Sequence, residues 1–180
     1  NLTLGFSSSE PLDNSSTVTL LGKTLTPTAQ GNSYSVTYTM QDNDTEGEIA
    51  FTAIAKDLAG NQTVFTATSD NSSVKFDRSS PLISSVSLQS NNRHPLYAKS
   101  GDNLSLFFTA NEAIKTSAVT FSNSMQAEVE DNGISRFHAT YNLQDNDTEG
   151  VIPLTVSAED LAGNITIFTK TSDNSSVIFD

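Results

Sequence analysis

The chain has 180 residues, a formal net charge of −12 and no cysteine. An acidic surface repels nucleic acids and anionic membranes, so neither is expected as a partner. Without cysteine the chain forms neither disulfides nor thiolate metal sites, and a hard cation held by oxygen atoms is the obvious substitute cross-link.

Residues 1–10 alternate apolar and polar side chains, which is the pattern of a half-buried strand, and the same pattern returns at 103–112. In the second copy, a stretch of about twenty-five residues precedes this strand (residues 78–102) and contains another alternating run at 82–88. The first copy has no such run before it. We therefore expect the first repeat to lack its opening strand, and residue 1 to be an arbitrary entry point into a longer array.

Further strands are expected at 17–22, 34–40, 47–55 and from residue 61, with a last short one at 74–77, and their counterparts follow about 103 residues later. Gly60 and Asn61 suit the positive φ of a tight turn between two of these strands. No helical periodicity is present. Seven short strands in about 103 residues, with turn signals between them, predict an all-β chain of two tandem immunoglobulin-like (Greek-key) sandwiches.

The duplication sets the domain boundaries. Residues 41–77 match 144–180 at 27 of 37 positions with a constant shift of 103, and QDNDTEG, DLAGN and TSDNSSV return unchanged. A period near one hundred residues is too long for a solenoid unit, so each copy is expected to be a domain. The predicted domains are residues 1–78, the incomplete repeat, and residues 79–180.

The opening SSSEPLDNSSTVTL, the turn DLAGN and the junction SSVKFDRSSP together resemble the tandem bacterial immunoglobulin-like repeats of large surface adhesins. Residues 77–81 match the family's junction, Asp57 and Asp160 match its acidic turn residue, and residues 101–114 match its second strand. The resemblance implies an extender or stalk module of a secreted, surface-attached protein. It also implies an extracellular location and joints that calcium stiffens.

The acidic loop at residues 41–47 allows two interpretations. One is an ordinary solvated turn rich in Asp and Asn. The other is a calcium site, since Ca²⁺ takes about 6–8 oxygen ligands in irregular geometry. If the loop lies at the end of the domain where the last strand finishes, carboxylates of both repeats converge on the junction. The predicted interdomain calcium ligands are Asp42, Asp44, Glu46, Asp77, Glu112 and Asp160.

The sequence offers no catalytic constellation. His94 lies in a polar run and His138 on the outward side of a strand, so both are expected at the surface. Neither has a matching acid and nucleophile at a defined place, and there is no glycine-rich phosphate loop and no paired histidine for zinc. A non-catalytic protein is therefore expected.

Asn-x-Ser/Thr sequons are frequent, although the duplication reduces their independent weight. If the source organism glycosylates them, the protein would be a glycan-coated fibre subunit. The possible acceptors are Asn14, Asn43, Asn61, Asn71, Asn103, Asn146, Asn164 and Asn174.

Two classes of function remain open on the sequence. The domains are either structural spacers whose partners are neighbouring repeats of the same chain, or adhesive modules that bind a glycan or a protein through their loops. The near identity of the loops in the two copies favours spacers, because a dedicated recognition loop would differ from its neighbour. The mostly inward aromatic residues also favour spacers, since a glycan site usually exposes an aromatic platform.

Overall fold

The computed structural model describes residues 1–122, 125–131 and 135–180. The described residues form strands and loops without an α-helix, and the predicted all-β fold is confirmed. No helix in this part of the chain is long and apolar enough to span a membrane. Contacts divide the chain into a first unit, Asn1–Arg78, and a second unit, Ser79–Asp180.

The first unit contains two main sheets and a small ribbon. The strand orders are β1-β5-β4 and β3-β2-β7-β8, and β6 pairs with β9. Every pairing in this unit is antiparallel. The strands are β1 (Leu2–Ser7), β2 (Thr17–Leu20), β3 (Lys23–Leu25), β4 (Thr28–Gln30), β5 (Ser33–Tyr38), β6 (Gly47–Glu48), β7 (Phe51–Lys56), β8 (Gln62–Phe65) and β9 (Lys75–Phe76).

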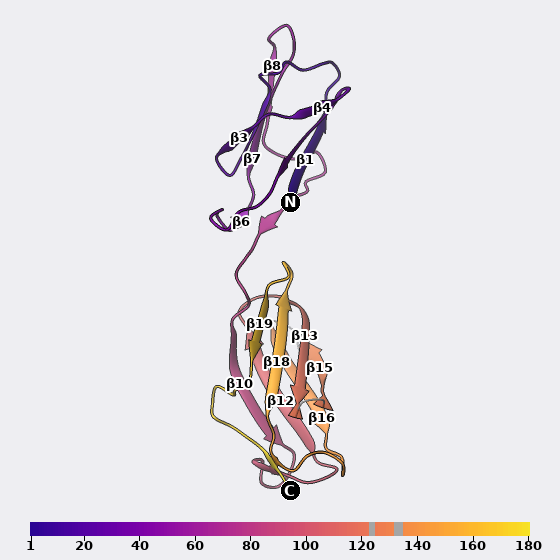
Figure 1. The fold of residues 1–180 in the computed structure, drawn as a ribbon, viewed down its shortest axis with the longest axis vertical. Coiled ribbons are helices and arrows are strands. Elements are labelled where there is room, and N and C mark those ends of the chain that lie inside the picture. Colours follow the sequence, from indigo (N-terminus) through magenta and orange to yellow (C-terminus); the bar gives the residue numbers. More distant parts are fainter. Residues whose placement is uncertain (123–124, 132–134) are drawn as a thin grey trace. The chain divides into compact units, whose positions relative to one another are not determined.

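The second unit repeats this plan and adds two strands. Its sheets have the orders β10-β12-β16-β15, β14-β13-β18-β19 and β11-β20-β17. Figure 1 shows β13 and β18 side by side in this unit, and they pair antiparallel. The strands are β10 (Ile83–Ser90), β11 (Tyr97–Ala98), β12 (Asn103–Ala110), β13 (Ile114–Phe121), β14 (Met125–Gln126), β15 (Glu128–Asp131), β16 (Arg136–Asn142), β17 (Gly150–Val151), β18 (Leu154–Asp160), β19 (Ile165–Phe168) and β20 (Ile178–Phe179).

Strand by strand, β1 to β9 correspond to β12 to β20, in pairing as well as in sequence order. The strands β10 and β11 have no counterpart in the first unit. The expectation that the first repeat lacks its opening strand is therefore met by the strand order.

Alternating side chains of the facing strands build each core. The second unit buries a large cluster that includes Leu104, Leu106, Phe108 and Phe121. The first unit buries only Val18, Leu20, Val36 and Ala53 in its core cluster, with other apolar residues partly covered. Tyr34 of the first unit is buried as well. The residues predicted to point inward on β1 are half-buried, whereas their counterparts on β12 are buried.

Candidate metal centre

The acidic loop of the first unit is held by its own carboxylate. Asp44 is buried. Its Oδ2 accepts a hydrogen bond from the backbone N–H of Gln41 at 2.7 Å. Its Oδ1 accepts from the hydroxyl of Tyr38 at 3.1 Å and pairs with Lys23 Nζ at 2.9 Å. The Gln41 N–H, together with Lys23 and Tyr38, holds the pKa of Asp44 below its usual value despite the opposing effect of burial.

The second copy of the loop repeats this arrangement. Asp147 Oδ2 accepts from the backbone N–H of Gln144 at 2.8 Å, and Asp147 Oδ1 accepts from the Tyr141 hydroxyl at 3.1 Å. Burial and the bond to Asp147 raise the pKa of Tyr141, so the phenol stays protonated and donates. In both copies the second of the loop's three acidic residues closes the turn and ties it to the preceding strand.

The other two acidic residues of the first loop are exposed. Glu46 Oε1 accepts a hydrogen bond from the backbone N–H of Arg78 at 2.9 Å, and the Arg78 Nε lies 3.6 Å away. Gly47 pairs with Phe76 in the β6–β9 ribbon. These contacts place the acidic loop next to the last strand of the first unit, as the sequence led us to expect.

Asp160 closes the DLAGN turn at the end of β18 and is buried. Its Oδ1 accepts from the backbone N–H groups of Ala162 and Asn164, both at 2.8 Å, and its Oδ2 accepts from Asn164 Nδ2 at 2.8 Å. Burial acts to raise the pKa of Asp160, but the hydrogen bonds from Asn164, Gly163 and Ala162 outweigh it and the pKa lies below the usual value. Asp160 is therefore charged at neutral pH.

The prediction of positive φ in this turn was right for Gly60 and wrong for Asn61. Gly60 has a φ of +94°, whereas Asn61 is not among the residues with positive φ. Asn61 instead donates its backbone N–H and its Nδ2 to the Asp57 carboxylate, at 2.7 and 2.6 Å. The side chain thus serves as a hydrogen-bond donor in the turn.

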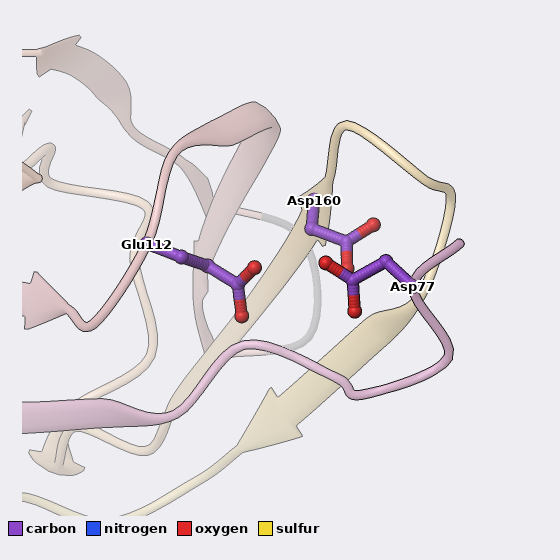
Figure 2. A group of neighbouring side chains, drawn as sticks. All are labelled: Asp77, Glu112 and Asp160. Atoms are coloured by element: carbon purple, nitrogen blue, oxygen red, sulfur yellow. The ribbon is translucent and has the colours of Figure 1, made fainter. Parts of the chain in front are cut away.

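Three of the six predicted ligands form a group. One carboxylate oxygen from each of Asp77, Glu112 and Asp160 lies within 4.8 Å of the other two. Figure 2 shows the three side chains. Glu112 and Asp77 are partly buried. Asp77 Oδ2 also pairs with Lys75 Nζ at 2.9 Å.

The chemistry of these donors suits a hard cation. Ca²⁺ takes about 6–8 oxygen ligands at roughly 2.3–2.6 Å, so ligand oxygens within about 5 Å of one another can share one ion. Three carboxylates supply between three and six of these oxygens. Among the residues that the structure describes, Asp42, Asp44 and Glu46 do not join this group.

Of the two histidines, His94 is exposed, as expected. His138 lies on the outward side of β16 but is partly covered, because its ring stacks on Phe107 with centroids 4.4 Å apart. The His138 Nε2 atom is buried and has no hydrogen-bond partner among the described residues. This stack is a contact that the sequence did not indicate.

The possible glycosylation acceptors differ in accessibility. Seven of the eight are exposed, and Asn164 is half-buried. Asn61 and Asn164 each donate Nδ2 to the aspartate of their turn. The six exposed residues outside these turns are Asn14, Asn43, Asn71, Asn103, Asn146 and Asn174.

Solved structures to which the chain is similar include an adhesion-protein repeat and a protein of a glucan utilization locus. No protein-family model matches the chain, and no curated protein matches it. A tetra-tandem repeat from the extending region of a large adhesion protein is 17% identical, with a TM-score of 0.45. The Bacteroides ovatus mixed-linkage glucan utilization locus protein SGBP-B, in complex with a mixed-linkage heptasaccharide, is 19% identical, with a TM-score of 0.28.

Each likeness covers 99% of this chain but less than half of the other, 45% and 41% respectively. The chain thus spans under half the length of either solved structure. TM-scores below 0.5 do not establish a shared fold, so the function proposed below rests on this chain's own residues.

Proposed function

We propose that the chain is a non-catalytic extender module of a secreted, surface-attached repeat protein of the adhesin type. The observation that carries this proposal is the duplication. Strands β1 to β9 correspond one by one to β12 to β20, and three connecting segments, QDNDTEG, DLAGN and TSDNSSV, keep their sequence. Repeating the same domain lengthens and stiffens a protein. A recognition site, in contrast, needs specialised loops in only one domain.

The details of the loops support the same function. Asp44 and Asp147 make equivalent hydrogen bonds within their own units. The need to form this turn is enough to explain why the two copies of the loop have the same sequence. The neighbouring repeats of the same chain are the proposed partners, and the proposed location is extracellular.

Calcium is the proposed cofactor, held by Asp77, Glu112 and Asp160. Three carboxylates at this spacing repel one another, and Lys75 offsets only part of their charge. A divalent cation removes the repulsion, and through Asp77 it would stiffen the segment that links the repeats. Water or backbone oxygens would complete its coordination.

Calorimetric titration of the chelator-treated protein with CaCl₂ tests this part of the proposal. We expect one site, lost in the double variant Asp77→Ala, Glu112→Ala. The matched control is Asp42→Ala, which removes an exposed acidic residue outside the group and should leave the site intact. Binding that survives the double variant, or no binding to the parent protein, would reject the calcium site.

A glycan array, screened with and without calcium, tests the extender function itself. The extender proposal expects no specific glycan in either condition. Specific retention of one glycan class would show instead that the chain is an adhesive module.

A further inference from the structure

The sheet β14-β13-β18-β19 of the second unit ends at β19, which pairs with β18 (Figure 1) and, among the described residues, with no other strand. Edge strands present unpaired backbone N–H and C=O groups. The equivalent strand β8 also ends its sheet in the first unit. A whole repeat follows β8 in the chain and a whole repeat precedes β19, so neither repeat supplies a strand to the other's edge.

The backbone groups of Ile165 and Ile167 turn toward the open side of β19. Asp160 N donates to the C=O of Asn164, the residue just before β19. Backbone groups alternate in direction along an antiparallel strand, so the N–H and C=O of Thr166 also face β18. The groups of Ile165 and Ile167, on either side of Thr166, point away from β18 and can bond to an added strand.

The outward side chains of this edge are apolar. Ile165 and Ile167 are 54% and 65% exposed, and the four residues of β19 carry no charge. Glu159 lies opposite Ile165 on β18, and its carboxylate pairs with Lys115 Nζ at 2.9 Å. The edge is therefore apolar and locally neutral, although the chain as a whole has a net charge of −12.

The other edges of the two four-stranded sheets in this unit are protected against pairing. The register of β10 shifts between Ser84 and Ser87, which marks a bulge. The strand β15 contains Glu128, Glu130 and Asp131, and β14 has only two residues. Bulges, charges and very short strands are the features by which natural sheets avoid edge-to-edge contact. In contrast, β19 has a regular register and neither charge nor proline.

We propose that β19 pairs antiparallel with β19 of a second copy of this chain. The strand is complementary to itself, because a pairing centred on Thr166 places Ile165 opposite Ile167 of the second copy. A two-fold axis at this point makes the contact identical for both copies. Each Ile165–Ile167 pair then exchanges both of its N–H···O bonds, and the exposed isoleucines of the two copies join in one apolar patch.

The contact between two such strands is small. It belongs to the weak interfaces that bury less than about 1,200 Å², so we expect a dissociation constant on the order of 0.1–1 mM. Along an extender with many repeats, as the proposed function holds, the contact recurs and gains strength by multivalency. The dimer is tested on this chain alone, so its absence would leave the extender proposal standing.

Sedimentation equilibrium of the full chain, from about 10 μM to about 1 mM, tests the dimer. The double variant Ile165→Lys, Ile167→Lys should weaken it at least about tenfold, because like charges then face each other across the contact. The matched control is Leu96→Lys, Val151→Lys, which makes the same charge change at side chains that are 55% and 66% exposed. All four side chains are exposed, so both variants should keep the unfolding midpoint of the parent.

Amide hydrogen exchange tests the backbone pairing without any substitution. In dilute solution the N–H groups of Ile165 and Ile167 should exchange faster than those of Thr166 and Phe168, which face β18. In concentrated solution the exchange of Ile165 and Ile167 should slow at least about threefold, as the dimer forms.

A single cysteine tests the register, because the chain has none of its own. Thr166 would face Thr166 of the second copy as a non-hydrogen-bonded pair with Cα atoms about 4.5 Å apart, a distance that a disulfide spans. Oxidised Thr166→Cys should therefore form a covalent dimer. The control Thr155→Cys, an exposed position on the neighbouring strand β18, should not.

Four outcomes would overturn the proposal. They are a monomer over the whole concentration range, a dimer that the isoleucine variant forms as well as the parent, exchange at Ile165 and Ile167 that does not depend on concentration, and equal disulfide formation by the two cysteine variants.

Discussion

At the scale of single residues, acidic side chains at the turns stabilise backbone conformation. Asp44, Asp147 and Asp160 each accept hydrogen bonds from at least one backbone N–H group and from at least one side chain of the same unit. A carboxylate that accepts several such bonds is stabilised in its charged form. The acidic composition of the chain is thus partly explained by its turns.

Asp160→Ala should destabilise the second unit by about 1–3 kcal/mol, because it removes a buried carboxylate and leaves two N–H groups of the turn without their acceptor. Thermal or urea unfolding of the full chain measures the loss. The matched control is Asp173→Ala, an exposed residue whose Oδ1 accepts from Ser175 N. Equal and small effects of the two changes would show that water replaces Asp160 in the turn.

Stability should fall as the solution becomes more acidic. The pKa values of Asp44, Asp57 and Asp160 lie below the usual value in the folded chain. Between the folded and unfolded pKa values the unfolded state binds more protons, so this stabilisation is present above the unfolded pKa, about 4, and is lost as pH falls through the folded values. Unfolding midpoints measured from pH 7 down to pH 2 check this sign, and a flat profile would contradict it.

The sequence indicated the positions of some of these acidic residues and missed the hydrogen bonds of others. The group of Asp77, Glu112 and Asp160 follows from strand order, because each residue ends a strand or begins the next loop. The internal role of Asp44 was missed because it depends on Tyr38 and Lys23, which approach it only after folding. A signal existed, since tyrosine precedes the aspartate by six residues in both copies.

At the scale of elements, the sequence predicted the long strands and the short last strand, but it gave no signal for the short strands β3 and β4. The patterns at 1–10, 34–40 and 103–112 correspond to β1, β5 and β12. The strands β3 and β4 lie in a region that the sequence indicated only as a loop. Their exposed or half-exposed side chains carry no period-two pattern, and pairing with β2 and β5 defines them.

A matched pair of substitutions compares the two units at equivalent strands. Leu106 of β12 is fully buried, and its counterpart Leu4 of β1 is half-buried. Leu106→Ala should cost about 2–5 kcal/mol of the second unit's stability, through lost burial and a cavity. Leu4→Ala should cost the first unit less, about 1–2 kcal/mol, because less apolar surface is lost.

Calorimetry on the full chain distinguishes the two effects, because we expect each unit to unfold with its own transition. The less covered first unit should also melt first in the parent protein. Equal losses at Leu4 and Leu106 would mean that the two side chains bury similar apolar surface in solution.

At the scale of the whole molecule, the duplication was the strongest signal in the sequence. It predicted two domains because 27 of 37 positions recur at one constant shift, and it predicted the extra strand of the second repeat because 82–88 has no earlier copy. The sequence predicted six calcium ligands as a group, but it could not tell which of the six lie apart from it. Asp44, for example, pairs with Lys23 of its own unit, and this contact could not be predicted from the sequence.

Small-angle X-ray scattering with calcium and with a chelator tests the calcium proposal at this scale. The three carboxylates of Asp77, Glu112 and Asp160 repel one another without a cation, so removing calcium should free the linking segment and broaden the distribution of interatomic distances. Asp77→Ala should give the broad distribution even with calcium, whereas Asp42→Ala should not. Both variants should keep the unfolding midpoints of the two units, because neither side chain belongs to a core cluster. If scattering is the same in both conditions, the ion does not stiffen the link, and residues 77–81 alone determine how the repeats move.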